Sequence, residues 1–193
     1  MGNRFVGDNF LSNFDSFREH MLAADYGGVV NPVDKVTYPD CSYDIPETVK
    51  AEIVSRLSHM TGRVIDPIHG FVVRLTAAHT ATAPHQAHTD AVMSQFTFLL
   101  YLSDGVGGTA LVSHKETGMN ANPVNDEELA VWERDHNIYD AWNIDELIPM
   151  KANRAVIIPS ELMHRAEPVE GYGSTVYDGR LVLISFINLG DVL

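Results

Sequence analysis

The eight residues from Ala83 to Asp90, followed by the apolar run Phe96–Leu102, constrain this sequence more than any other stretch. Within them, His88 and Asp90 are separated by one residue. On an extended strand such residues point to the same face, with Cα atoms about 6.6 Å apart. An imidazole and a carboxylate so placed can converge on one metal ion, as in iron sites built from two histidines and one carboxylate. The pair therefore predicts half of a metal site.

A second histidine follows a later strand-like stretch. The apolar run in 154–159 predicts a strand, a turn is expected at Pro159–Glu161, and His164 comes just after it. Arg180 then stands at the start of another β-rich run. An arginine at the mouth of a strand can hold a carboxylate through two parallel hydrogen bonds.

The pattern of apolar residues predicts two helices followed by many short strands. Helices are expected at about 12–26 and 46–59, with a loop at 31–44 between them. Strands are predicted at 71–75, 88–90, 94–103, 109–113, 154–159, 163–168 and 180–188, with a third helix at 125–137. This order indicates an α+β, mainly β fold, a jelly roll or cupin-like barrel with the N-terminal helices on one outer face.

We expect one domain over residues 1–193, with a helical support at about 1–62 and a barrel at about 63–193. The connection at about 114–151 is long for a hairpin and is predicted to be an insertion, commonly a lid or a substrate-facing wall. Trp132 and Trp142 flank it and either cover a substrate or anchor the insertion to the barrel, of which anchoring is the expected role.

Composition excludes several classes of partner. The formal net charge of −13 argues against binding to nucleic acid or to anionic membranes. The apolar runs are too short to span a bilayer, and Cys41, the only cysteine, excludes an internal disulfide and fits a reducing cytoplasm. The sequence predicts no oligomeric state.

These motifs together resemble the Fe(II)- and 2-oxoglutarate-dependent dioxygenases, in layout closest to the prolyl-hydroxylase-like branch. The resemblance covers about 71–188 and rests on His88-Thr89-Asp90, on the buried strand that leads to Gly107-Gly108-Thr109-Ala110, on His164, and on Gly179-Arg180. The runs 107–118 and 150–154 are similar to a poorly characterised bacterial subgroup of that superfamily.

The resemblance implies a double-stranded β-helix in which His88, Asp90 and His164 hold Fe(II). It further implies that 2-oxoglutarate chelates the metal, that Arg180 pairs with its distal carboxylate, and that Tyr101 donates a hydroxyl to the same carboxylate. O2 would be the second cosubstrate. Because an aspartate is present in the motif, the resemblance favours a hydroxylase or desaturase acting on a small molecule or on a peptide- or carrier-bound residue.

Two features depart from the family pattern. The gap from His164 to Arg180 is long, with Val169–Asp178 expected as an inserted loop, and Arg74 stands where relatives often carry a tyrosine. Two other classes therefore stay open: a cupin-like metalloenzyme that does not use 2-oxoglutarate, and a non-catalytic module that senses a metal or ligand. Tyr101 is equally compatible with a core tyrosine whose hydroxyl is satisfied.

The remaining candidates have plainer interpretations. Arg74 and Arg154 either line a substrate pocket or bind the outer wall of the barrel. Four further histidines are expected to be loop residues without a metal: His79, His85, His114 and His136.

Overall fold

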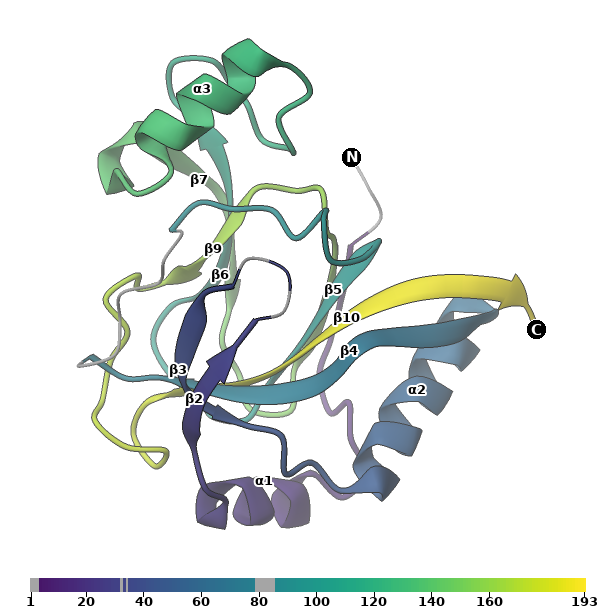
Figure 1. Ribbon diagram of the computed structural model, residues 1–193. Helices are drawn as coiled ribbons and strands as arrows, with labels where there is room; N and C mark the ends of the chain where they lie inside the picture. The colour runs from purple at the N-terminus through teal and green to yellow at the C-terminus, as the bar shows by residue number, and fades with distance from the viewer. Residues whose placement is uncertain (1–3, 32, 34, 79–85) are drawn as a thin grey trace.

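The computed structural model describes residues 4–31, 33, 35–78 and 86–193. It consists of two antiparallel sheets, with two helices below the larger sheet and a third helix at the opposite end of the molecule (Figure 1). The predicted α+β, mainly β jelly roll with N-terminal helices on one outer face is confirmed. Within the described residues, none of the helices is long and apolar enough to cross a membrane.

The larger sheet has seven strands and the smaller has three. In spatial order the larger sheet contains β1 (Phe5–Gly7), β8 (Ala155–Pro159), β5 (Phe96–Tyr101), β10 (Arg180–Val192), β4 (Arg63–Thr76), β3 (Thr37–Ser42) and β2 (Gly27–Val30). The smaller sheet contains β7 (Trp142–Pro149), β6 (Gly108–His114) and β9 (His164–Glu167). The helices are α1 (Phe14–Ala23), α2 (Glu47–Thr61) and α3 (Asp126–Asp135), with a 3-10 turn at Tyr139–Ala141.

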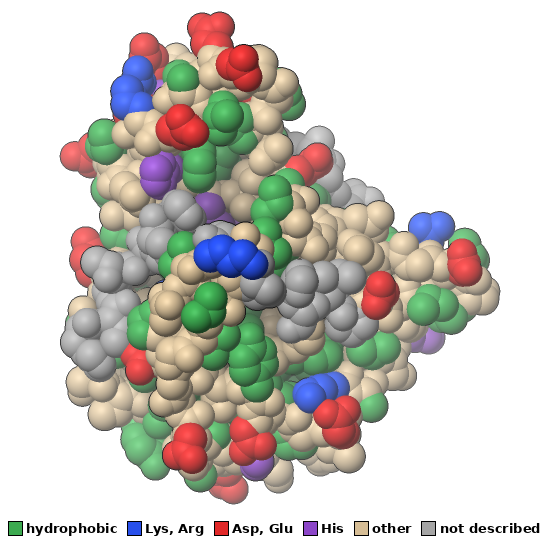
Figure 2. All heavy atoms as spheres, in the orientation of Figure 1, with side chains coloured by type: hydrophobic (Ala, Val, Ile, Leu, Met, Phe, Trp, Pro, Cys, Tyr) green, Lys and Arg blue, Asp and Glu red, His purple; other side chains and the backbone are tan. Residues whose placement is uncertain are grey.

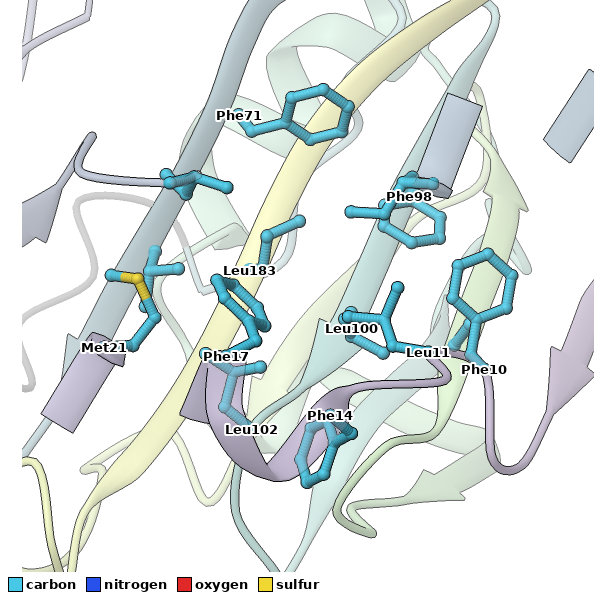
Figure 3. Close-up of a cluster of buried hydrophobic side chains, with 14 of the residues drawn as sticks. Phe10, Leu11, Phe14, Phe17, Met21, Phe71, Phe98, Leu100, Leu102 and Leu183 are labelled. Carbon is cyan, nitrogen blue, oxygen red and sulfur yellow. The ribbon is translucent and has the colours of Figure 1, made fainter. Parts of the chain in front are cut away.

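Alternation along the central strand β10 separates the two faces of the larger sheet. Leu181 and Leu183 point to the helical layer, whereas Val182 and Ile184 point into the barrel. The outer face packs against α1 and α2 in one core that contains the aromatic and aliphatic side chains of Figure 3. This division fixes which side chains of β4, β5 and β10 can reach the interior of the barrel.

Helix α1 is shorter than predicted. Phe14, Phe17 and Met21 recur at helical spacing and are buried, but the helix ends at Ala23 rather than near Tyr26. The chain turns there because β2 begins at Gly27, and the Tyr26 hydroxyl donates a hydrogen bond to the Met21 carbonyl at 2.9 Å.

Helix α2 agrees with its prediction of 46–59 to within one residue at its start and two residues at its end. It runs over Glu47–Thr61, and Gly62 closes it in the left-handed conformation with φ of 65°. Glycine is favoured there because it has no Cβ to oppose that conformation.

The loop predicted at 31–44 is wrong, because Thr37–Ser42 forms β3. Cys41 and Ser42 pair with Arg74 and Val73 of β4, and β2 pairs with the other side of β3. Pro39 suggested a loop, yet it lies where the register between β2 and β3 shifts, a position at which a sheet tolerates proline. Pairing with β4 therefore outweighed the local sequence.

The predicted insertion at 114–151 is too long, because its last part is β7 of the smaller sheet. The connection that remains carries α3, which forms a lobe at the top of Figure 1. His114, predicted to be a loop residue, is instead buried, and its Nε2 lies 2.9 Å from the Asp135 carboxylate. This contact joins α3 to the end of β6.

Gly107 and Gly108 lie where three strands of the smaller sheet begin or end. A Cβ on Gly107 would lie 2.1 Å from the Glu167 carbonyl oxygen, and one on Gly108 would lie 2.0 Å from that of Ile148. Only glycine permits this approach of three backbones, which explains the Gly-Gly pair before Thr109.

Replacement of Leu183 tests the helix-to-sheet core. Because this side chain is fully buried, Leu183→Ala is expected to lower the free energy of unfolding by about 2–5 kcal/mol. Val92 is exposed, so Val92→Ala is the control and is expected to change stability by less than about 0.5 kcal/mol. Urea denaturation measures both, and equal effects of the two substitutions would contradict the assigned core.

Candidate metal centre

His88 and Asp90 do not lie on a regular strand, contrary to the prediction for 88–90. His88 instead forms an isolated antiparallel bridge with His164, in which each backbone N–H donates to the other carbonyl at 3.0 and 2.9 Å. Two residues later, the Asp90 N–H donates to the Ser160 carbonyl at 2.8 Å. These bonds to His164 and Ser160 hold the segment 88–90 in place without a regular strand.

The bridge brings three side chains to one point. Ligand atoms of His88, Asp90 and His164 all lie within 4.8 Å of one another. His164 Nε2 is 3.3 Å from Asp90 Oδ2, and His88 Nε2 is 3.9 Å from Asp90 Oδ1. Small side-chain rotations would bring all three to the distances of about 2.0–2.2 Å at which divalent metals bind nitrogen and oxygen. The residues thus fit a divalent metal with two imidazoles and one carboxylate on one side.

Backbone carbonyls orient both imidazole rings. His164 Nδ1 lies 2.9 Å from the Leu162 carbonyl, and His88 Nδ1 lies 3.4 Å from the Gln86 carbonyl. A carbonyl oxygen only accepts, so each Nδ1 carries a proton, and each Nε2 is the ring atom left beside Asp90 to bind a metal. Hydrogen bonds of this kind from the far ring nitrogen orient metal-binding histidines in proteins.

Attraction between Asp90 and the two histidines determines the charge state of the site. Burial alone would raise the pKa of Asp90, but the nearby His164 and His88, with a hydrogen bond from Thr97, outweigh it and hold the pKa at about 2. Burial opposes ionisation of His164 as well, yet Asp90 raises the pKa of this imidazole above its ordinary value. A carboxylate that stays ionised is a permanent ligand for a cation.

Arg180 and Tyr101 lie deeper in the barrel, on neighbouring strands. Arg180 is buried; its guanidinium carbon is 5.9 Å from the Tyr101 ring centroid and its Nη2 is 3.5 Å from the Gly108 carbonyl. Within the described part of the chain, its Nε has no hydrogen-bond partner. The Tyr101 hydroxyl donates to Thr109 Oγ1 at 2.7 Å. A buried guanidinium with an unused donor fits a carboxylate ligand.

One cavity of about 460 Å³ connects these parts. The triad and Arg180 both line it, as does Thr109. Tyr101 is fully buried next to the cavity, with its hydroxyl held by Thr109. The structure therefore places four of the five predicted site residues on the wall of one cavity and Tyr101 just behind that wall.

No protein-family model and no curated protein matches this sequence. Solved structures do match. SnoN, a non-heme alpha ketoglutarate-dependent epimerase from nogalamycin biosynthesis, gives a TM-score of 0.54 at 15% identity over 94% of this chain and 76% of its own. SnoK, a carbocyclase from the same biosynthesis, gives 0.51 at 12% identity over 96% and 79%. EctD from S. alaskensis, solved with 2-oxoglutarate and 5-hydroxyectoine, gives 0.50 at 12% identity over 96% and 71%.

The chain has the fold of the 2-oxoglutarate-dependent non-heme enzymes. Within this fold, Thr97 is a site residue that sequence reasoning missed. Its hydroxyl donates to Asp90 Oδ2 at 2.6 Å and lies 3.1 Å from the Ser160 hydroxyl. A polar side chain in the otherwise apolar run Phe96–Leu102 was the available signal, since a buried threonine hydroxyl needs a partner.

The remaining candidate residues divide into those that line the cavity and those that do not. Arg154 binds Asp8 at 2.6 Å on the outer wall, whereas Arg74 lines the cavity. Trp142 is buried and donates to the Asp135 carbonyl, and Trp132 donates to the Ala87 carbonyl at 2.9 Å, both as expected of anchors. Trp132 also lines the cavity. Among the four plainer histidines, His136 caps α3 and stacks on Trp132, while His79 and His85 lie outside the described residues.

Loss of the Thr97 hydroxyl tests the support of the carboxylate. Thr97→Val is expected to weaken Mn(II) binding by about tenfold, because side chains that hydrogen-bond to metal ligands contribute at least that much. Ser94→Ala is the control, since the Ser94 hydroxyl contacts the Ser160 hydroxyl and the Phe96 carbonyl but not the Asp90 carboxylate. Calorimetric titration measures both variants, and equal Mn(II) affinities would contradict this role of Thr97.

The Asp90–His164 pair predicts how metal-free stability depends on pH. The raised pKa of His164 contributes stability that is complete below about pH 6.5 and is lost as pH rises through the folded-state value. The depressed pKa of Asp90 contributes stability above about pH 3.8 that is lost as pH falls toward 2. Asp90→Asn should therefore destabilise the protein more at about pH 5 than at about pH 9 in urea denaturation. A loss independent of pH would contradict the ion pair.

Proposed function

We propose that this protein is an Fe(II)- and 2-oxoglutarate-dependent oxygenase that oxidises a C–H bond of an organic substrate, by hydroxylation or desaturation. The observation that carries the proposal is the joint placement in one cavity of the His88–Asp90–His164 triad and of Arg180, whose buried Nε has no hydrogen-bond partner among the described residues. A triad alone suits many metalloenzymes. A buried arginine at the end of the same cavity adds a site for a carboxylate.

The fold supports the choice of cofactors. SnoN was solved with Fe3+ and alpha ketoglutarate, and EctD with 2-oxoglutarate. When bound, iron and 2-oxoglutarate would supply O2 activation, with oxidation of 2-oxoglutarate to succinate and CO2. Two histidines and one carboxylate leave the remaining positions of an iron ion open for such ligands.

The chain itself binds and orients these groups. Asp90 stays ionised at neutral pH and balances part of the metal charge. Both histidines present Nε2 to the metal because their Nδ1 atoms face backbone carbonyls. His164 lies opposite Leu111 on β6, and Arg180 contacts Gly108 of the same strand. Three residues of strand, about 10 Å, thus separate the backbone at the two ends of the cosubstrate site.

Tyr101 and Thr109 fix the far end of that site. The Tyr101 hydroxyl donates its hydrogen bond to Thr109. The tyrosine ring therefore packs beside Arg180, and the Thr109 hydroxyl is the polar group that borders the cavity. We therefore assign to Thr109 the donor role that the family resemblance implies for Tyr101, with Tyr101 as the positioning residue. Apolar side chains nearby, Leu99 and Ile184, exclude water from the cosubstrate.

The fold accommodates several outcomes after C–H oxidation begins, since SnoN is an epimerase and SnoK a carbocyclase. Hydroxylation or desaturation is proposed here because Asp90 completes the ligand set that the sequence pattern associates with those reactions. The substrate is a small molecule or a peptide- or carrier-bound group that enters beside α3 and the β2–β3 hairpin.

Anaerobic titration tests the proposal directly. Protein with Fe(II) is titrated with 2-oxoglutarate, and a weak visible metal-to-ligand charge-transfer band is expected, absent in His88→Ala. Iron binding without the band would favour a metalloenzyme that does not use 2-oxoglutarate. Absence of iron binding would contradict the triad.

Arg180→Gln tests the carboxylate site separately from the metal. We expect the Kd for 2-oxoglutarate to rise about 10- to 100-fold, because a charge-assisted pair contributes about 1.5–3 kcal/mol. The Kd for Fe(II) should stay unchanged. Arg154→Gln is the matched control, since its guanidinium binds Asp8 outside the cavity. An unchanged 2-oxoglutarate Kd in Arg180→Gln would exclude Arg180 as the anchor.

A further inference from the structure

A second arginine faces the same cavity and is not used by the proposed cosubstrate. Arg74 lies on β4, directly opposite Val182 of β10. Arg180 comes two residues before Val182 on β10, so Arg74 and Arg180 both point to the inner face of the sheet. On the other side, Arg74 pairs with Cys41 of β3. It thus stands between the Arg180 end of the cavity and the wall made by the β2–β3 hairpin.

One donor of the Arg74 guanidinium is unused. Its Nε is buried and has no hydrogen-bond partner among the described residues, and the guanidinium carbon lies over the Tyr38 ring at 5.0 Å from the centroid. Burial lowers the pKa of Arg74, whereas Cys41, Tyr38 and Asp40 raise it, with Asp40 the weakest of the three. Arginine nevertheless stays protonated in proteins. A buried cation without a counter-ion is costly unless a ligand supplies one.

The charges around the cavity leave Arg74 unbalanced. Among the described residues that line it, the arginines are Arg74, Arg165 and Arg180, and the only carboxylate is Asp90. Arg165 is neutralised by Glu167, whose Oε1 accepts from its Nε at 2.6 Å. Asp90 is assigned to the metal and Arg180 to 2-oxoglutarate. Asp40 attracts Arg74 but does not line the cavity, and no ion pair joins the two among the described residues. With these assignments, Arg74 is the one cation of the described cavity wall without a directly paired carboxylate, in a protein whose net charge is −13.

We propose that Arg74, with the Tyr38 ring beneath it, binds a carboxylate of the primary substrate, so that the enzyme acts on an organic acid. This inference rests on the proposed function, because it assigns Arg180 to the cosubstrate. A monoanion matches a single unpaired guanidinium, and no lysine lies among the described residues of the cavity wall. A phosphate dianion would need further donors.

The rest of the wall indicates an apolar body for this acid. Toward solvent the cavity is bordered by aliphatic side chains of three separate segments: Val29, Val33, Val92 and Leu129. Trp132 adds an aromatic surface from α3. These groups would bury an alkyl or aryl chain, and the carboxylate would fix its orientation.

Sheet register places the carboxylate away from the metal. Thr97, which holds Asp90, lies opposite Phe186 of β10, whereas Arg74 lies opposite Val182. Four residues of strand correspond to about 13 Å. The oxidised carbon therefore lies several bonds from the carboxylate, rather than adjacent to it.

Matched probes test the preference for an acid without turnover. Protein loaded with Mn(II) and saturating 2-oxoglutarate is titrated with octanoate and with octanamide, which differ only in the charged group. Binding is followed by the fluorescence of Trp132, which lines the cavity. We expect octanoate to bind about tenfold more tightly than octanamide, as one charge-assisted contact allows.

Substitutions then locate the charge that is recognised. In Arg74→Gln the preference should fall below about twofold while the Kd for 2-oxoglutarate changes less than about threefold. Arg74→Lys keeps the charge without the bidentate geometry and should retain an intermediate preference. It also serves as the second variant if Arg74→Gln does not fold.

Three results would overturn the inference. These are equal binding of octanoate and octanamide by the wild type, the same acid preference in Arg74→Gln, or a lysine variant no more selective than the glutamine variant. A loss of 2-oxoglutarate affinity in Arg74→Gln equal to that in Arg180→Gln would instead make Arg74 a cosubstrate anchor. Titrating the Mn(II)-loaded protein with 2-oxoglutarate alone separates the two failures. Absent 2-oxoglutarate binding would contradict the proposed function, whereas 2-oxoglutarate binding without an acid preference would contradict only the acid site.

Discussion

The antiparallel bridge between His88 and His164 is the interaction on which the rest of the site depends. Two backbone hydrogen bonds join segments from opposite halves of the chain and set both imidazoles beside Asp90. Bringing these two distant segments of the chain together costs conformational entropy. The pairings of β5 with β8 and β10 offset that cost, because they fix the strands that adjoin the two histidine segments. The site therefore needs no regular strand at His88.

Charge is distributed unevenly between the surface and the cavity. Acidic side chains are spread around the outline of the molecule in Figure 2, from the α3 lobe to the opposite end. The cavity instead presents the guanidinium groups of Arg74 and Arg180 and the imidazoles of the triad. Surface carboxylates are screened by water and salt, whereas buried cations act at close range in a low dielectric. An acidic protein can thus hold an anionic cosubstrate and, by our inference, an acidic substrate.

Predictions from the sequence were accurate where the signal came from neighbouring residues and failed where it depended on residues far along the chain. Helix α2 was predicted almost to the residue, since Pro46, its apolar spacing and Gly62 all act within the helix. Strand β3 was missed because Pro39 and its polar neighbours suggest a loop, and only pairing with β4 makes them extended. Strand β7, which lies inside the predicted insertion, was missed as well, because only its pairing with β6 makes 142–149 extended. Thr97 looked like an ordinary strand residue because its partner, Asp90, is reached only in the folded barrel.

The sequence by itself determined the ligand types, their order and the alternation that turns Arg180 toward the barrel interior. These depend on chemistry and on strand period, which are readable from neighbouring residues. Only the tertiary structure decided that His88 reaches His164 through a bridge, that the Tyr101 hydroxyl donates to Thr109, and that Arg74 lines the cavity with its Nε unpaired among the described residues. Each of these outcomes depends on which distant backbone lies alongside, and sheet pairing, rather than local propensity, determines that.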